Sequence, residues 1–323
     1  MKIAVLGAGA MGSIYGGHLS ANNDVYMIDK KAELVDKINA DGLKLFENDT
    51  DVIYHPAALL SSEGIGEVDL VIIFVKALYS RAALMENKGI IGDNTYVMTL
   101  QNGAGHEDII LEFVPKERII IGTTEDNGAI LGDGYVRRGG KGKTNIGMLV
   151  EDSQHMLDKV KVCLDSCGFD THIYDNIQQL IWDKLFTNVS LSALTGVLQV
   201  PIGFIATDEY AWNMTVTLIK EAMQVAKAMG LKFDEEEMIE RVRNTSLNSP
   251  EGRTSIYADL KAGRLTEVNT ISGAVVKAGD RLGVPVPSHK MIVNMIHSME
   301  NKSKNNVESV SYTHLTLPTN REV

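Results

Sequence analysis

The chain begins Met1-Lys-Ile-Ala-Val-Leu-Gly7-Ala-Gly9-Ala-Met-Gly12, and this stretch decides the fold. Apolar and β-prone residues lead straight into the glycines. Gly7 permits a tight turn out of the strand, Gly9 lets the backbone approach a pyrophosphate, and Gly12 lets the next helix pack closely on the sheet. A helix from about Ala10 to Ser20 then directs its positive end at the phosphates. The stretch predicts a dinucleotide-binding site formed by Gly7, Ala8, Gly9, Ala10, Met11 and Gly12.

A second strand, from Val25 to Asp29, ends in an acid at the spacing expected for a ribose-binding carboxylate. Asp29 favours the free 2′-hydroxyl of NAD. Lys30 and Lys31 follow it and could hold the 2′-phosphate of NADP. The strand, the helix and the acid together make the glycine motif specific, but they leave the choice between NADH and NADPH open.

Composition narrows the function classes. The 323 residues carry a formal net charge of −11, from 31 basic and 42 acidic side chains, which opposes binding to nucleic acid or to an anionic membrane as a main role. The longest apolar runs, such as that from Leu70 to Val75, are too short to span a bilayer. No targeting segment is recognised, so we expect a cytoplasmic protein. The eight histidines are scattered and the two cysteines, Cys163 and Cys167, are not a CxxC pair, so no metal site is predicted.

The first half of the chain alternates strand and helix patterns, which predicts a mostly parallel sheet. Expected strands cover 2–6, 25–29, 69–75, 95–99, 118–122 and 170–174. Expected helices cover 10–21, 31–40, 77–86, 105–113 and 152–168. Residues 134–138 and 144–149, separated by Gly-Gly-Lys-Gly, are expected to pair as a two-stranded turn of the sheet.

After Asp175 helical periodicity takes over. Expected helices cover 177–198, 207–229, 234–243, 253–262, 266–282 and 287–300. We therefore predict an α/β fold: a Rossmann-type, doubly wound dinucleotide-binding domain over 1–175 and an all-α substrate domain over 176–300. Residues 301–323 form a tail expected to be disordered. From about Val310 the tail resembles translated adapter sequence and is set aside as non-native.

Lys184 is the most informative residue of the helical half. At helical spacing it shares a face with Ile177, Ile181 and Asn188, and the opposite face carries large apolar residues such as Trp182. Burying an unpaired ammonium is costly, so a lysine held there needs a partner, and Asn188 one turn away could serve. The alternative is that Lys184 extends to a nearby surface.

Two strands of the sheet end in polar residues, at the edge where ligands of open α/β sheets bind. Lys76 follows one strand and could lie along the cofactor, although it could equally be a solvated strand end. Asn102 follows another in Gln-Asn-Gly and could contact the nicotinamide ribose and the substrate, although Asn before Gly is also common in turns.

Further polar residues lie in the helical half. Glu267 is expected to head a helix whose face continues through apolar Ile271 and Val275, so it points toward an interior, although an acid in a first turn is also favoured by the helix dipole. Ser255 fits a helix cap or first-turn position as well as a ligand contact.

These segments resemble the ketopantoate reductase (2-dehydropantoate 2-reductase) family over essentially residues 1–300. The resemblance rests on five stretches: Gly7-Ala-Gly-Ala-Met-Gly12, Val75-Lys-Ala77, Leu100-Gln-Asn-Gly-Ala-Gly105, Trp182-Asp-Lys-Leu-Phe-Thr-Asn188, and Ser255 followed by Thr266-Glu-Val-Asn-Thr-Ile-Ser-Gly273. The combination of Lys-x-x-x-Asn with the later Thr-Glu is specific, whereas the glycine motif alone is not.

The resemblance implies NADPH-dependent reduction of ketopantoate to pantoate, in pantothenate biosynthesis. Lys184 would be the general acid, and Asn102 and Asn188 would orient cofactor and substrate. Ser255 and Glu267 would bind the substrate's carboxylate and hydroxyl groups, and Lys76 would line the cofactor groove.

The chain departs from the family at two positions. Ser192 stands where some members have a second Asn, which blurs substrate detail. Asp29 stands where NADPH-preferring members often carry Arg, which makes an NADH-using variant plausible.

Two alternatives remain. One is a related two-domain 2-keto or 3-hydroxy acid dehydrogenase with another substrate. The other is a non-catalytic, dinucleotide-sensing regulator, although such a sensor needs no proton donor like Lys184. Helical second domains of this kind often pair, so a homodimer is one expectation. A small keto acid is the expected ligand besides the cofactor.

Overall fold

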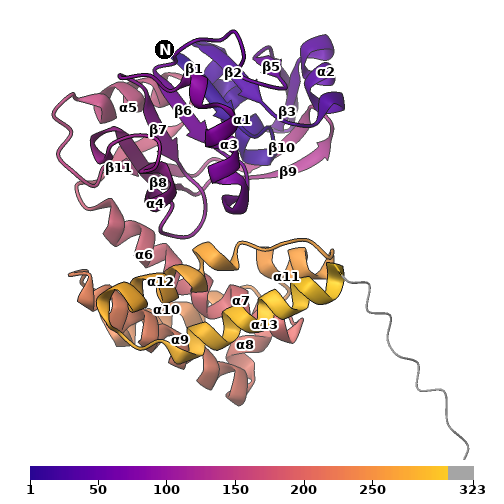
Figure 1. The fold of residues 1–323 in the computed structure, drawn as a ribbon. Helices are drawn as coiled ribbons and strands as arrows, with labels where there is room; N and C mark the ends of the chain where they lie inside the picture. Colours follow the sequence, from indigo (N-terminus) through magenta and orange to yellow (C-terminus); the bar gives the residue numbers. More distant parts are fainter. Residues whose placement is uncertain (305–323) are drawn as a thin grey trace, which may run out of the picture.

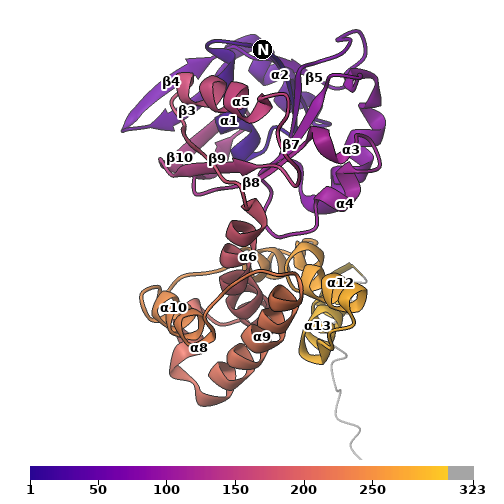
Figure 2. The same cartoon turned by 90° about the vertical axis from the view of Figure 1, so that its left-hand side faces the viewer.

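The computed structural model describes residues 1–304, in which a half that holds both sheets sits above a half built of helices (Figure 1). The expectations for the tail beyond residue 304 lie outside the described residues. The last strand of the sheet half, β12 (Asp170–Ile173), is followed directly by helix α6 (Ile177–Thr187). Figure 2 shows α6 descending from the sheet half into the helical half. This helix therefore connects the two halves and contributes to both.

The large sheet is mostly parallel, as predicted. Its strands follow the order β12-β11-β8-β7-β6-β1-β2-β5, and the β11–β8 pair is the antiparallel one. The bounds not yet given are β1 Lys2–Leu6, β2 Asp24–Ile28, β5 Ala57–Leu59, β6 Leu70–Ile73, β7 Tyr96–Thr99, β8 Ile119–Thr124 and β11 Lys143–Gly147. Alternate strand residues feed two separate cores, because successive side chains point to opposite faces of a sheet.

Helices cover both faces of this sheet, which confirms the doubly wound fold. α1 (Ala10–Ser20), α2 (Ala32–Asp41) and α5 (Met156–Ser166) pack on one core. α3 (Ser80–Glu86) and α4 (Glu107–Ile110) pack on the other, which the helical half shares. α4 is shorter than the predicted helix over 105–113, because its first residues form the glycine-rich turn after β7.

The predicted pairing of residues 134–138 with 144–149 is wrong. β10 (Tyr135–Gly140) belongs to a second, four-stranded sheet of order β4-β3-β10-β9, whereas β11 joins the large sheet. The Gly-Gly-Lys-Gly segment crosses between the sheets instead of making a hairpin. Gly142 passes so close to β8 that a Cβ there would lie 2.4 Å from the Glu125 carbonyl carbon.

Several short elements had no strong sequence signal and were not predicted. They are β3 (Leu43–Glu47), β4 (Thr50–Tyr54), β5, β9 (Asn127–Gly132) and the helix α8 (Ile202–Thr207). β4 and β9 are largely exposed, so neither the alternating nor the continuous apolar pattern of a core strand marks them.

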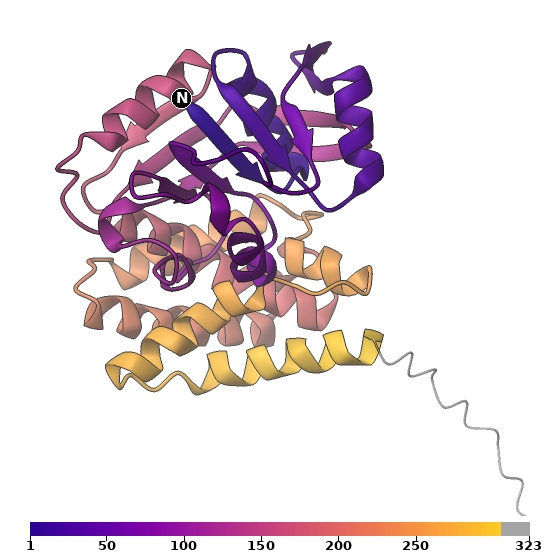
Figure 3. The same cartoon turned by 45° about the horizontal axis from the view of Figure 1, so that its top comes forward.

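The remaining helices form the second half (Figure 3), with the long α13, in yellow, among them. Their bounds are α7 Ala193–Leu198, α9 Glu209–Ala228, α10 Glu235–Leu247, α11 Ser255–Lys261, α12 Ser272–Leu282 and α13 Pro287–Lys304. The helix predicted over 266–282 begins only at Ser272, because a 3₁₀ turn occupies Val268–Thr270. Glu267 therefore precedes this turn and does not head the helix.

The predicted helix over 177–198 is one continuous rod with a π-helical segment, Asn188–Ser192, between α6 and α7. It is buried on opposite faces, as the sequence predicted: Trp182 and Phe186 are buried on one side and Ile177 and Ile181 on the other. π-helical segments are rare and often occur at functional sites.

Candidate functional site

One edge of the large sheet gathers most of the predicted site. Leu6, Ile73, Thr99 and Ile121 form a continuous register row across β1, β6, β7 and β8. Three residues further along the chain from each of these positions lie Gly9, Lys76, Asn102 and Thr124. These strands are parallel, so the four residues leave the sheet at the same carboxyl edge, where ligands of open α/β sheets bind.

The glycine loop has the geometry that a dinucleotide requires. Gly7 has φ of 97°, and a Cβ there would lie 2.8 Å from the Val75 nitrogen. A Cβ on Gly12 would lie 1.9 Å from the Gly7 carbonyl oxygen, which shows how closely α1 packs on the loop. A Cβ on Gly9, in contrast, would meet nothing within 4 Å. The loop therefore leaves open space at Gly9, at the N-terminus of α1, where a pyrophosphate fits.

Asp29 holds this loop and faces the same site. Its Oδ2 accepts a hydrogen bond from the Ala8 backbone nitrogen at 2.8 Å, and its Oδ1 accepts one from the Lys31 nitrogen at 3.0 Å. The two neighbouring lysines have acidic partners. Lys30 Nζ donates to Glu86 at 2.8 Å, and Lys31 Nζ donates to Asp133 at 2.6 Å.

Lys184 lies toward the other end of the sheet edge, in a half-buried position. Its Nζ donates a hydrogen bond to the Thr124 carbonyl oxygen, at the end of β8, at 3.0 Å. The predicted partner, Asn188, is thus replaced by a main-chain acceptor from the other half of the molecule. Burial lowers the pKa of the Lys184 ammonium below its usual value, while the carboxylate of Glu125 opposes that shift. The Lys184 ammonium is thus partly desolvated and contacts the sheet half.

Lys76, Asn102 and Glu267 meet where the halves touch. Lys76 Nζ donates to Asp259 Oδ2 on α11 at 2.9 Å. The next residue along the chain, Ala77, donates its backbone N–H to Glu267 Oε1 at 3.2 Å. The Asn102 carbonyl oxygen accepts from Thr270 Oγ1 at 3.3 Å, and Asn102 itself is exposed. The strand ends of β6 and β7 therefore dock on the segment around Glu267.

The other predicted substrate residues lie on the helices of the second half. Ser255 is the exposed first residue of α11, and the capping role belongs to Thr254, whose side chain accepts from the Tyr257 nitrogen. Asn188 begins the π-helical segment and Ser192 ends it, buried. Within residues 1–304, no hydrogen bond joins Lys184 to Asn102, Asn188, Ser255 or Glu267. The structure thus brings together Glu267 with the Lys76 and Asn102 loops, and separately Lys184 with Thr124.

A cleft of about 410 Å³ between the halves lies on the far side of α6. It is lined by Trp182 and Glu267 among others, whereas Lys184 follows Trp182 by two residues and so lies roughly 200° around the helix. Lys184 is not among the residues that line this cleft.

Functional contacts that the sequence did not reveal include Thr124 and Asp259. Thr124 acts through its main-chain carbonyl, which any residue type offers, so no sequence pattern could have identified it. Within residues 1–304 there is no group of three or more His, Cys, Asp or Glu side chains that could hold a metal ion. The same part of the chain contains no helix both long and apolar enough to cross a membrane.

Comparison with known proteins agrees with this geometry. Residues 3–151 match the family described as "Ketopantoate reductase PanE/ApbA", and residues 176–300 match its C-terminal counterpart. The 2-dehydropantoate 2-reductase of Streptococcus pyogenes serotype M3 is 31% identical over 302 residues, which cover 93% of this chain and 98% of the relative. The Lactococcus lactis enzyme of the same name is 32% identical over 306 residues, with 93% and 98% coverage.

Solved structures show the same relationship. A ternary structure of D-mandelate dehydrogenase with NADH and anilino(oxo)acetate aligns with a TM-score of 0.85 at 33% identity, over 94% of this chain and 99% of that one. A PanE/ApbA family ketopantoate reductase from Ralstonia eutropha aligns with a TM-score of 0.84 at 27% identity, over 94% and 100%. Both matches extend across the two halves. The chain therefore belongs to the ketopantoate reductase PanE/ApbA family of oxidoreductases.

Proposed function

We propose that this protein reduces a 2-oxo acid, with ketopantoate as the first candidate, and that Lys184 is the general acid. The observation that carries the proposal is the partly desolvated Lys184 ammonium held by the Thr124 carbonyl, at the same sheet edge as the glycine loop. Its hydrogen bond goes to a carbonyl, and the Glu125 carboxylate acts on it only through space, so the desolvation of the charge is only partly compensated. A proton donor benefits from this incomplete compensation, which makes the proton easier to release.

Ketone reduction needs a hydride at carbon and a proton at oxygen. When bound, reduced nicotinamide supplies the hydride. A positive Lys184 beside the carbonyl oxygen stabilises the negative charge that develops there and then donates the proton. The Thr124 carbonyl accepts one of the three ammonium protons and so fixes the direction of the other two.

The substrate groups are assigned by their positions. Glu267 Oε1 is engaged by the Ala77 N–H, which leaves Oε2 to accept from a substrate hydroxyl. We assign Ser255, on the exposed first turn of α11, to the substrate carboxylate. We assign Asn102 and Asn188 to orient the cofactor and the substrate.

For the cofactor we propose NADH in preference to the NADPH that the family resemblance implies. Asp29 places a carboxylate where the 2′-oxygen of the adenosine ribose is expected, and a 2′-phosphate would be repelled by it. Lys30 and Lys31 could offset this charge, but each already pairs with a carboxylate, Glu86 and Asp133. The NADH-bound D-mandelate dehydrogenase structure supports the same assignment.

That relative also supports a second candidate substrate, an aryl 2-oxo acid. Its structure contains NADH and anilino(oxo)acetate, and its identity to this chain, 33%, is no lower than that of the 2-dehydropantoate 2-reductases. The buried Ser192, in place of a second Asn, removes one amide from the region near the proposed substrate site. Both substrates contain a 2-oxo group, whose oxygen Lys184 would protonate.

A four-way assay tests these assignments. Oxidation of NADH and of NADPH is followed with ketopantoate and with benzoylformate, at matched concentrations. We expect the largest kcat/KM with ketopantoate and NADH. A larger value with benzoylformate would select the second substrate, and a preference for NADPH would refute the assignment of Asp29. Cofactor binding without turnover of any 2-oxo acid would refute the reductase and favour a dinucleotide-sensing regulator.

A cytoplasmic location and a homodimer are further proposals that follow from the family resemblance. Size-exclusion chromatography with light scattering measures the mass in solution, and a monomer over the working concentration range would refute the dimer.

A further inference from the structure

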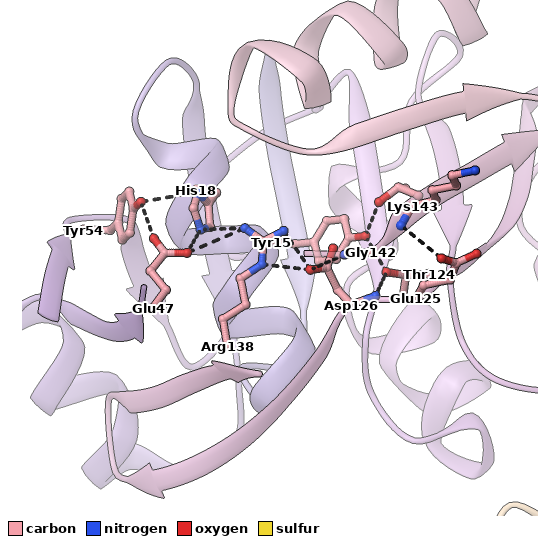
Figure 4. Close-up of polar contacts among 11 residues, drawn as sticks. Tyr15, His18, Glu47, Tyr54, Thr124, Glu125, Asp126, Arg138, Gly142 and Lys143 are labelled. Atoms are coloured by element: carbon pink, nitrogen blue, oxygen red, sulfur yellow. Dashed lines mark hydrogen bonds and ion pairs between the residues drawn. The ribbon is translucent and has the colours of Figure 1, made fainter. Parts of the chain in front are cut away.

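Thr124, whose carbonyl oxygen accepts a hydrogen bond from Lys184, is itself held by a buried polar network (Figure 4). The Thr124 hydroxyl accepts hydrogen bonds from the Asp126 backbone nitrogen and from Tyr15 Oη, each at 3.0 Å. Tyr15 Oη also lies 2.6 Å from Thr144 Oγ1 on β11. The side chain of Thr124 is therefore held by α1, by its own loop and by the neighbouring strand, which sets the direction of its carbonyl.

Asp126 is in turn held by Arg138, which lies on β10 of the second sheet. Arg138 Nε donates to Asp126 Oδ1 at 2.8 Å, and the Gly142 nitrogen approaches the same oxygen at 3.5 Å. Beyond Arg138 the network continues to Glu47, 3.6 Å away, which pairs with His18 at 3.0 Å. The contacts thus run from the second sheet to the loop that ends β8.

The Arg138–Asp126 pair is unusual in its burial. The exposed fractions of the two side chains are 2% and 0%, whereas the Lys44–Asp51 pair of the same sheet has 39% and 40%. Asp126 Oδ2 is also buried without a hydrogen-bond partner in the described part of the chain. Burying two charges is expensive, and apolar residues of similar volume often stabilise a protein equally well. Stability alone therefore does not account for this pair.

We propose that Arg138 and Asp126 are a positioning pair for proton transfer, which fixes Thr124 so that its carbonyl orients the Lys184 ammonium. This inference rests on the proposed function of Lys184 as the general acid. Neither residue touches the substrate. Their effect is transmitted through the Asp126 N–H and the Thr124 hydroxyl to one carbonyl oxygen.

The central test is the double variant Asp126→Leu/Arg138→Met, which removes both charges together and leaves neither one buried alone. Glu47 loses the Arg138 guanidinium but keeps its hydrogen bonds with His18 and Tyr54, and Glu47→Gln alone is the control for that loss. We expect normal NADH affinity by fluorescence and an unchanged KM for the 2-oxo acid, with kcat reduced roughly 10²-fold, as small misplacements of reacting groups cause. A kcat equal to that of the wild type would show that the pair is structural only.

A mutant cycle separates positioning from general damage. The same double substitution is made in a Lys184→Met background, where there is no ammonium to orient. We expect no further loss of the residual rate there. An equal fold-loss in both backgrounds would overturn the inference, because the pair would then act by another route. Asp51→Asn, which breaks the exposed pair of the same sheet, is the matched control and should leave kcat unchanged.

If the double variant does not fold, Thr124→Val tests the same relay. It keeps the side-chain shape and removes the hydroxyl that accepts from Asp126 and Tyr15. The expected result is again a loss in kcat without a change in KM, and an unchanged kcat would contradict the relay.

Competitive acetylation of lysines, followed by mass spectrometry, keeps this inference distinct from the proposed function. It measures the reactivity of Lys184 relative to an exposed reference, Lys290, and needs no turnover. We expect Lys184 to react several-fold faster in Thr124→Val and in the double variant, because its ammonium is released from the carbonyl. Unchanged reactivity would overturn the positioning inference. Absence of turnover in the wild type would instead overturn the reductase.

Discussion

The two ends of the sheet edge are built in different ways. At the β1 end, the loop from Gly7 to Gly12 and the acid Asp29 lie within one short stretch of chain. Backbone geometry requires glycine at positions 7 and 12, and Asp29 accepts a hydrogen bond from the loop. At the β8 end, Lys184 is held by the main chain of Thr124, 60 residues earlier. The first end binds through a local motif, and the second acts through a tertiary contact. The proposed proton transfer therefore depends on an acceptor, the Thr124 carbonyl, that no sequence motif marks.

The largest effect should come from the β8 end. Replacing Lys184 by Met removes the proposed proton donor, and the loss of a general acid lowers kcat by roughly 10²–10⁴-fold. NADH affinity, measured by fluorescence, should stay unchanged because the glycine loop is intact. Lys220→Met, which breaks an exposed pair with Glu235, is the control and should retain wild-type kcat. A Lys184 variant with full turnover would eliminate the assignment.

The β1 end should respond next, through cofactor binding. Gly9→Ala places a Cβ in open space at a φ of −68°, so we expect normal thermal stability and NADH binding weakened by roughly tenfold or more, since the pyrophosphate approaches there. Gly12→Ala should also lose stability, by about 1–3 kcal/mol, because its Cβ would lie 1.9 Å from the Gly7 oxygen. Fluorescence titration and thermal melting separate the two effects, and equal stability losses would contradict this distinction.

A smaller effect is expected in cofactor choice. Asp29→Asn removes the charge that opposes a 2′-phosphate, so the ratio of kcat/KM for NADPH to that for NADH should rise roughly tenfold, equivalent to about 1.4 kcal/mol. Glu86→Gln releases Lys30 and should shift the ratio in the same direction by less. An unchanged ratio in both variants would mean that the 2′ position is recognised elsewhere.

The smallest effect concerns how the contribution of Lys184 to the stability of the folded protein depends on pH. Because burial lowers the pKa of Lys184 in the folded state below its usual 10.5, the unfolded chain binds more protons between the two values. The wild type therefore gains stability as pH rises through that interval, and Lys184→Met does not. The melting temperature of the wild type minus that of Lys184→Met should increase toward pH 10.5. A difference that is flat with pH would indicate that Lys184 is not desolvated.

The same contrast explains what could be predicted from the sequence. The mostly parallel sheet, its faces covered by helices, and the buried rod that contains Lys184 follow from apolar periodicity and glycine spacing, and the structure confirms them. The predicted hairpin was wrong because glycines mark close approach as well as turns, and only the fold shows that Gly142 passes against β8. The helix predicted to start near Glu267 begins at Ser272, because a 3₁₀ turn follows the same short-range periodicity.

The catalytic assignments are less completely predictable. The roles of Lys184, Asn102, Asn188, Ser255 and Glu267 stay predictions. The acceptor of the Lys184 hydrogen bond could not be foreseen, since a carbonyl oxygen carries no side-chain identity. Arg138 and Asp126 also gave no signal, because each looks like an ordinary charged residue near a turn until the second sheet brings them together.

The apolar core shared by both halves determines how the molecule unfolds. Ile119 and Ile121 of the sheet half belong to the same buried cluster as Trp182, Leu194 and Val275 of the helical half. Cutting the chain between β12 and α6 would expose part of this cluster on both fragments, so neither is expected to be a self-sufficient folding unit. The two halves are distinct in architecture but should unfold in a single cooperative transition. The dinucleotide-binding half therefore depends for its stability on the helices that carry the proposed proton donor.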